Sequence, residues 1–251
     1  MWWQAFGKNA PIIIPKFGGK YKPAKSAIIR LKCPISVAKV NSHQPLITGL
    51  VLCGGKAERM QGQDKGLLPL KHQTLAHWAI ERLLPQVSQL AINANRNHPA
   101  YEAISQHFAL QTGRKIPVYS DTYPGFVGPL GGFHTGLSHC QTEYLLVIPC
   151  DSPLFPSNLA SELLQNLLAQ QTDLAYAITA PIDHRPQAYP VFCLMRANLL
   201  TSLCAYLDQG ERKIDRWFAT QKNSAVLFPD VQAFANINTL AELAHTESLL
   251  A

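Results

Sequence analysis

The sequence predicts an α/β fold built on a mostly parallel sheet with helices on both faces. From Leu46 onward, short aliphatic and β-branched runs alternate with amphipathic stretches, as in sheets whose strands are joined by crossover helices. Hydrophobic residues make up 47% of the 251 residues and charged residues 15%, which is enough apolar surface for a packed core. Glycines and polar side chains gather after the apolar runs, where ligands bind in such sheets.

The strands are predicted from short apolar runs bounded by polar or turn-forming residues. They are Thr48–Cys53, Leu90–Asn95, Pro117–Ser120, Tyr144–Pro149, Leu174–Thr179, Tyr189–Leu194 and Ala225–Phe228.

The helices are predicted from the amphipathic stretches between these runs. They are Thr74–Leu84, Ala100–Phe108, Leu130–His139, Asn158–Gln170, Asn198–Gln209 and Leu240–Leu249. In the fourth, Leu163, Leu164, Leu167 and Leu168 form one apolar stripe, which we expect to face the sheet.

The first 46 residues differ from the rest and are predicted to be a basic, disordered N-terminal extension to a transferase domain at residues 47–251. They hold eight lysines and arginines and no acidic residue, whereas the remainder has 14 basic against 16 acidic residues. The extension shows no helical or strand period. A harmless tail or start-codon artefact, a docking arm, and a nucleic-acid or membrane-surface arm all fit this composition.

The compartment is predicted from the cysteines and the hydropathy. The six cysteines include no C-x-x-C pair and mostly lie in apolar runs, as reduced thiols do. No secretory signal is recognisable, and no apolar run reaches the roughly 18 to 20 residues of a membrane span. We therefore expect a cytoplasmic protein without membrane association.

The loop after the first predicted strand is rich in glycine and in cations. Adjacent Gly54 and Gly55 permit positive φ angles and bring backbone N–H groups close to phosphate oxygens. Arg59 and Lys65 add positive charge. The spacing matches neither the P-loop nor the dinucleotide-binding loop. A tight turn with surface charges is the simpler alternative to a phosphate site.

The pattern L-x-G-G-x-x-x-R-M-x-x-x-D-K, from Leu52 to Lys65, resembles the start of the nucleotide-diphospho-sugar transferase-like nucleotidyltransferases. Within that group it is most similar to the molybdenum cofactor guanylyltransferase family, although Cys53 stands where the family usually has alanine and Gln61 where it usually has glycine. The resemblance implies a three-layer, Rossmann-like fold. It also implies that Arg59 and Lys65 are catalytic and that the nucleotide is bound by Leu52, Cys53, Gly54, Gly55 and Lys65.

A second motif is an apolar strand that ends in a carboxylate, Asp151, held between Pro149 and Pro153. Magnesium favours one or two carboxylates together with substrate phosphate oxygens, so one aspartate near a phosphate loop suffices. A lone aspartate here could also be a turn or cap residue. The segment resembles the family's P-C-D-x-P motif, which implies that Asp151 binds magnesium, contacts the nucleotide and acts in catalysis.

The loop that includes Asp121 and Pro129 to Gly132 is rich in glycine, which makes a close ligand plausible. It resembles the family's D…G-P-L-A-G segment, with Gly131 in place of alanine. The resemblance implies that Asp121 and Asn93, which ends the second predicted strand, bind the nucleotide. Taken alone, these residues are ordinary loop formers.

Three later segments resemble the family's Q-P-V-F, G-x-R-K and F-x-N-I-N-T-P signatures. They imply a second-substrate site formed by Gln187, Arg212, Lys213, Asn236 and Asn238. The two cations can pair with a substrate phosphate, and the asparagine amides can bond to a heterocycle. Capping of the last predicted helix is the alternative for the asparagines.

The resemblance implies magnesium-dependent transfer of GMP from GTP to the terminal phosphate of the molybdopterin-type molybdenum cofactor, with release of pyrophosphate. No serine, cysteine or histidine arrangement indicates a covalent intermediate. The alternatives are a CTP-dependent transferase acting on the same pterin, another sugar-phosphate or isoprenoid-precursor nucleotidyltransferase, and a non-catalytic nucleotide sensor or chaperone. Transient partners would be the proteins that supply and receive the cofactor; nucleic acid is not an expected partner.

Overall fold

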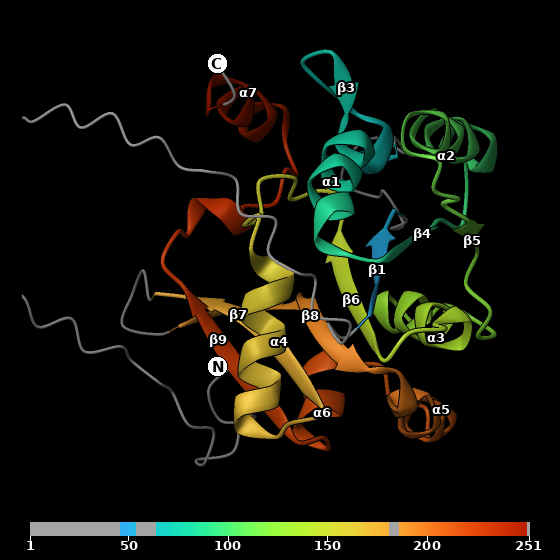
Figure 1. Cartoon of the computed structure of the whole chain (residues 1–251), viewed down its shortest axis with the longest axis vertical. Helices are drawn as coiled ribbons and strands as arrows, with labels where there is room; N and C mark the ends of the chain where they lie inside the picture. The colour runs from blue at the N-terminus through green and yellow to red at the C-terminus, as the bar shows by residue number, and fades with distance from the viewer. Residues whose placement is uncertain (1–45, 54–63, 181–185, 250–251) are drawn as a thin grey trace, which may run out of the picture.

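The computed structural model describes residues 46–53, 64–180 and 186–249, which form a seven-stranded sheet with helices packed on both faces (Figure 1). The strands of this sheet are β1 (Ile47–Leu52), β4 (Gln89–Asn93), β5 (Val118–Tyr119), β6 (Tyr144–Pro149), β7 (Leu174–Thr179), β8 (Gln187–Arg196) and β9 (Asn223–Phe228). Two short strands, β2 (Pro69–Leu70) and β3 (Gln73–Thr74), form a separate antiparallel hairpin.

The sheet is mostly parallel, as the sequence predicts. Its strand order is β5-β4-β1-β6-β8-β7-β9, and β8 runs antiparallel to both of its neighbours. The other pairs, β5–β4, β4–β1, β1–β6 and β7–β9, are parallel. The predicted three-layer α/β architecture is therefore confirmed.

The seven predicted strands correspond to the seven strands of this sheet, with differences at their ends. Tyr144–Pro149 and Leu174–Thr179 have the predicted bounds. The strand predicted at Tyr189–Leu194 extends over Gln187–Arg196, because its polar ends pair with Thr179 on one neighbour and Tyr144 on the other. Backbone pairing, unlike apolar patterning, does not stop at the edge of the core.

The α-helices are α1 (Leu75–Leu83), α2 (His98–Thr112), α3 (Pro129–His139), α4 (Leu159–Gln170), α5 (Leu200–Asp208), α6 (Ile214–Ala219) and α7 (Leu240–Leu249). Helix α2 is longer at both ends than predicted, and the first turn predicted for α5 is a 3₁₀ turn at Ala197–Leu199. Neither α6 nor the β2–β3 hairpin was predicted, because elements of this length are too short to show a periodic pattern. None of the helices in the described part of the chain is long and apolar enough to cross a bilayer.

Two hydrophobic layers hold the helices to the sheet. On one face α1, α2 and α4 bury Ile80, Tyr101 and Leu163 against the strands. On the other face α3, α5 and α6 bury residues that include Phe133 and Trp217. The predicted stripe of α4 only partly faces the sheet, since Leu163 and Leu167 are buried but Leu168 is 47% exposed.

Helix α3 packs closely on the sheet because it carries a glycine at the contact. A Cβ added at Gly136 would lie 2.6 Å from Leu50 Cδ2 and 2.9 Å from Leu145 Cδ2. The helix begins at Pro129, after Gly128 at a φ of 63°. The chain can therefore turn sharply from the sheet edge into this helix.

The pairing register brings the carboxyl ends of four strands to one level. Leu52 pairs with Asn93 on one side and with Pro149 on the other, and Asn93 pairs with Tyr119. The loops that follow these strands therefore start side by side.

The C-terminal segment returns to the same edge of the sheet. The backbone N–H of Ile237 donates a 2.8 Å hydrogen bond to the carbonyl oxygen of Asp151. The Ile237 side chain is buried against Leu70 and Leu75, beside the hairpin. Figure 1 shows α7 and β3 at the end of the molecule to which β1 and β6 point.

Candidate functional site

A cleft of about 600 Å³ lies at the carboxyl ends of β1, β4 and β6. Eight residues selected from the sequence line it, and they come from seven different segments of the chain. They are Leu52, Lys65, Asn93, Asp121, Asp151, Gln187, Asn236 and Asn238. Gln187 reaches this edge at the start of its strand, because β8 runs in the opposite direction to its neighbours.

The centre of the cleft contains a lysine held by two side chains. Lys65 Nζ lies 3.2 Å from Asp151 Oδ2 and donates a 2.5 Å hydrogen bond to Asn238 Oδ1. The side chains of Lys65 and Asp151 are 26% and 19% exposed. Lys65 thus links Asp151, which is predicted to bind the nucleotide and magnesium, to Asn238, which is predicted to bind the second substrate.

Lys65 is positioned by the buried aspartate that precedes it. Asp64 accepts hydrogen bonds from the Gly66 backbone N–H at 3.2 Å, the Tyr101 hydroxyl at 2.7 Å and Asn97 Nδ2 at 3.0 Å. Arg96 Nε lies 3.5 Å from the same carboxylate. Burial, with a further contribution from the bond to Asp64, raises the pKa of the Tyr101 hydroxyl well above its ordinary value. Tyr101 therefore remains protonated and donates its hydrogen bond to Asp64. Asp64 caps the 3₁₀ turn at Lys65–Leu67, so the start of this turn is held in place.

A second group of polar side chains orients Asp121. Asn93 Nδ2 donates to Asp121 Oδ1 at 3.0 Å, and Asn95 Nδ2 donates to Asp121 Oδ2 at 2.9 Å. The backbone N–H of Asp121 donates in turn to Asn95 Oδ1 at 2.7 Å. A Cβ at Gly131 would lie 2.6 Å from Asp121 Oδ2, so the carboxylate sits directly over α3. The result is a fixed acceptor at the wall of the cleft.

Asp151 is fixed through its backbone and presents its carboxylate to the cleft. Its carbonyl oxygen accepts from the Ile237 N–H, and the neighbouring Ser152 hydroxyl contacts the Asn236 side chain. No group of three or more metal-ligating side chains occurs among the described residues. A single carboxylate of this kind fits magnesium, which commonly takes its remaining ligands from water and substrate phosphates.

Two cysteines, Cys53 and Cys150, directly follow β1 and β6 and pack in the same core layer. Cys53 is fully buried and Cys150 is 5% exposed. Burial, and next the contact with Cys150, raises the pKa of the Cys53 thiol well above its ordinary value. Cys53 does not itself line the cleft, although its backbone N–H donates to the Asn93 carbonyl oxygen at 2.8 Å. Its side chain packs in the core.

Some of the predicted site residues are not part of this group. Gly54, Gly55 and Arg59 lie outside the described residues. Arg212 and Lys213 lie between α5 and α6 and do not line the cleft. Arg212 Nη1 donates instead to the carbonyl oxygens of two residues of the same segment, Leu207 and Glu211.

The cleft also contains residues that were not selected from the sequence. Asn95 and Arg96 follow β4, and Phe126, 62% exposed, lies in the loop before α3. The available signal was the position of Asn95 and Arg96 directly after an apolar strand, where ligand-binding residues are expected.

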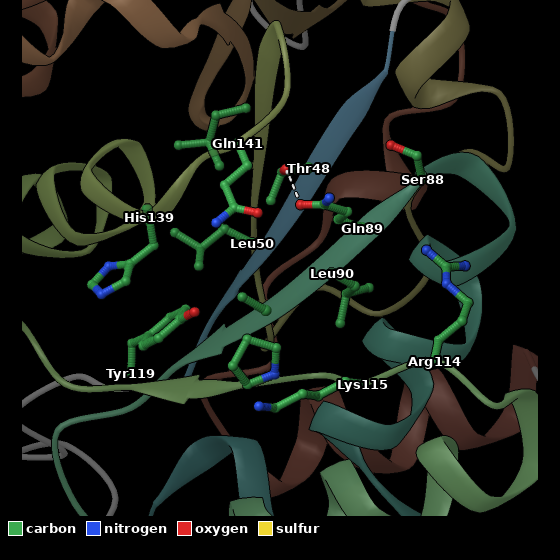
Figure 2. A pocket seen from close by; sticks show the side chains of 14 residues that line it. Thr48, Leu50, Ser88, Gln89, Leu90, Arg114, Lys115, Tyr119, His139 and Gln141 are labelled. Carbon is green, nitrogen blue, oxygen red and sulfur yellow. Dashed lines mark hydrogen bonds between the residues drawn. The ribbon is translucent and has the colours of Figure 1, made fainter.

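A second hollow, of about 340 Å³, lies near the amino ends of β1 and β4 and contains none of the predicted site residues (Figure 2). Tyr119 and His139 stack along one side, with ring centroids 3.9 Å apart. Arg114 lies on the other side. Its Nη1 donates to the carbonyl oxygen of Leu84 and its Nη2 to that of Val87, both at 2.8 Å. Arg114 therefore has a structural role.

A cleft at the carboxyl ends of a mostly parallel sheet is a common ligand site in α/β proteins. Comparison with known proteins shows that the chain is a nucleotidyltransferase. The chain belongs to the MobA-like NTP transferase domain family, whose model matches residues 49–225. A protein of Cupriavidus necator named molybdenum cofactor guanylyltransferase is 49% identical over 197 residues, which are 78% of this chain and 94% of that protein. A protein of the same name from Polynucleobacter asymbioticus is 48% identical over 204 residues, 81% of this chain and 97% of the relative.

Solved structures share the fold at much lower sequence identity. Molybdopterin-guanine dinucleotide biosynthesis protein A from Archaeoglobus fulgidus is 21% identical, with a TM-score of 0.61, and the match covers 81% of this chain and 98% of that chain. A 4-diphosphocytidyl-2C-methyl-D-erythritol synthase from Anaerococcus prevotii is 11% identical with a TM-score of 0.66, over 82% of this chain and 96% of that one. The solved structures support the fold, and the family model and the relatives confirm the family resemblance predicted from the sequence.

Proposed function

We propose that this chain transfers GMP from GTP to the terminal phosphate of the molybdenum-molybdopterin cofactor, giving the guanine dinucleotide form of the cofactor and pyrophosphate. The observation that carries the proposal is the match to relatives named molybdenum cofactor guanylyltransferase. It covers 94 to 97% of their length at 45 to 49% identity. The cleft supports it, since Lys65 contacts both Asp151 and Asn238 and thereby joins two predicted substrate sites.

In the proposed reaction, an oxygen of the acceptor phosphate attacks the α-phosphorus of GTP in line. A P–O bond forms to the acceptor as the bond to the β-phosphate breaks, and the electron pair leaves with pyrophosphate. The attacking phosphate is already anionic, so no general base is required. The protein has to align the two anions and offset their charge.

Of the proposed nucleotide-binding residues, Leu52, Asn93 and Asp121 line the cleft beside the ends of β1, β4 and β5. Gly54 and Gly55 would bind phosphate oxygens through backbone N–H groups, and Lys65 and Arg59 would offset the charge of the leaving pyrophosphate. Asn93 and Asp121, already bonded to each other, would hold the nucleoside, with the backbone at Leu52 and Cys53 alongside.

Asp151 is the proposed magnesium ligand. The metal, when bound, would neutralise charge on the triphosphate. The Lys65 ammonium group lies 3.2 Å from Oδ2 of this carboxylate.

The acceptor side of the cleft is formed by Gln187, Asn236 and Asn238. Their amides would bond to the pterin heterocycle. Arg212 and Lys213 would bind the acceptor phosphate only after their loop moves toward the cleft, because Arg212 is occupied by backbone carbonyls.

The cytoplasm is the proposed compartment, since all five cysteines in the described residues are free thiols. Transient contacts with proteins that supply and receive the cofactor are part of the proposal. So is the division into an N-terminal extension, residues 1–46, and a transferase domain; residues 1–45 lie outside the described residues. The CTP-dependent alternative is not favoured, because the relatives named above are guanylyltransferases.

The test is pyrophosphate release by the purified protein with magnesium and molybdenum-loaded molybdopterin, in parallel with GTP, CTP, ATP and UTP. We expect release with GTP that depends on the pterin. Release selective for CTP would move the function to a cytidylyltransferase. Absence of release with every nucleotide would refute the proposed reaction.

A further inference from the structure

Arg96 lies in the cleft at a position to which the family resemblance assigns no role. It follows the carboxyl end of β4 and precedes α2, and it lines the cleft with Asp64 and Lys65. Its side chain is 33% exposed, so it is partly desolvated while still accessible to a ligand. A guanidinium group in this setting is well suited to an anion.

One edge of the guanidinium group is anchored. Arg96 Nε lies 3.5 Å from Asp64 Oδ2, and this nitrogen is buried and makes no hydrogen bond. The Asp64 carboxylate is already bonded by Gly66, Asn97 and Tyr101. The Asp64 carboxylate therefore orients the Arg96 side chain by charge attraction and leaves the guanidinium N–H groups without a hydrogen bond to it.

The other edge has no protein partner. Within residues 46–53, 64–180 and 186–249, the two terminal amino groups of Arg96 make no hydrogen bond or ion pair. Arg114 shows the contrasting case, because both of its terminal amino groups are used on the carbonyl oxygens of Leu84 and Val87. A planar pair of donors, held at one edge and unused at the other, matches two oxygens of a phosphate group.

We propose that Arg96 binds a phosphate group of the nucleoside triphosphate through its terminal amino groups. The inference rests on the proposed function and adds a nucleotide-binding residue to it. Its location supports a phosphate rather than the base, because Arg96 is joined to Lys65 through the adjacent Asp64, whereas Asn95 turns toward Asp121. Lys65 and Arg96 then contact the triphosphate from two sides of one turn.

The experiment compares the binding of GTP, GMP and guanosine by calorimetry, with magnesium, for the wild type, Arg96→Lys and Arg96→Met. We expect Arg96→Lys to weaken GTP binding about 10-fold and Arg96→Met about 10-fold to 100-fold, as for the loss of hydrogen bonds to a charged group. Guanosine binding should change less than about twofold. A structural role limited to compensating Asp64 predicts instead equal losses for all three ligands.

Arg114→Lys is the matched control, because it makes the same chemical change outside the cleft and should leave GTP affinity unchanged. Arg96→Lys keeps the charge beside Asp64, so the comparison remains valid if the methionine variant does not fold. GTP binding by Arg96→Lys within twofold of wild type would overturn this inference alone. A wild-type protein that binds no GTP would overturn the proposed function, and this inference with it.

Discussion

Replacing Asp151 by alanine should separate activity from stability. The substitution removes the carboxylate proposed to hold magnesium. If the metal contributes about 3 kcal/mol or more of charge stabilisation, turnover should fall by about 100-fold or more. Asp151→Asn should behave in the same way, because a neutral amide of the same shape is a poor magnesium ligand.

The loss of stability should be small, and the structure indicates why. Among the residues that the structure describes, the carboxylate makes one ion pair, with Lys65 at 3.2 Å, and both side chains are partly exposed, at 19% and 26%. Such pairs contribute about 0.2–1 kcal/mol. The backbone hydrogen bond from Ile237 to the Asp151 carbonyl does not depend on the side chain. We therefore expect the free energy of unfolding to fall by about 1 kcal/mol or less, which lowers Tm by at most about 2–4 °C.

The assay is steady-state pyrophosphate release, with thermal unfolding and Mn²⁺ binding measured on the same preparations. Mn²⁺ binding in the presence of GTP should weaken in both variants. Near-normal turnover in Asp151→Ala, or unchanged Mn²⁺ affinity, would refute the metal assignment. A large drop in Tm would show instead that the carboxylate is needed for folding.

Two further predictions follow from packing and from titration. Gly132→Ala places a Cβ 2.5 Å from Leu52 Cδ2 and 2.7 Å from Asn93 Oδ1, so it should cost about 1–3 kcal/mol of stability and raise KM for GTP; an unchanged KM would contradict a nucleotide role for Asn93. Burial, then the proximity of His107, lowers the pKa of His77 below its ordinary value of 6.5. The contribution of neutral His77 to the free energy of unfolding is therefore complete above pH 6.5. It is lost as the pH falls through the folded-state pKa, because the unfolded state binds the proton more tightly. Urea titrations from pH 7.5 to 5 should show a shallower decline for His77→Gln, and parallel curves would exclude the effect.

The parts of the fold that could be predicted are those in which apolar patterning and structure coincide. Strands β6 and β7 were bounded correctly because nearly every residue in them is buried, so each reads as one apolar run. The reversal of β8 could not be predicted, since strand direction depends on partners distant in the sequence. Helix α6 was missed because its six residues hold only two buried side chains, Trp217 and Phe218.

The predicted site divides in a similar way. Asp151, Asn93 and Lys65 were selected because they follow strands or belong to a motif, and the structure gathers them in one cleft. Asn95 and Arg96 were not selected, because their importance depends on side chains about 30 residues away: Asp121 for the first and Asp64 for the second. A single sequence does not encode such pairings in any local pattern.

The reversed strand β8 divides the edge of the sheet into two parts that can change independently. On one side of Asp151, β1, β4 and β5 deliver residues at their carboxyl ends, whereas on the other side β8 delivers Gln187 at its amino end. Substitutions near the start of β8 can reshape one half of the cleft without shifting the register that aligns the other. One reactant could therefore be exchanged for another during evolution, or by design, while the residues proposed to bind the nucleotide are retained.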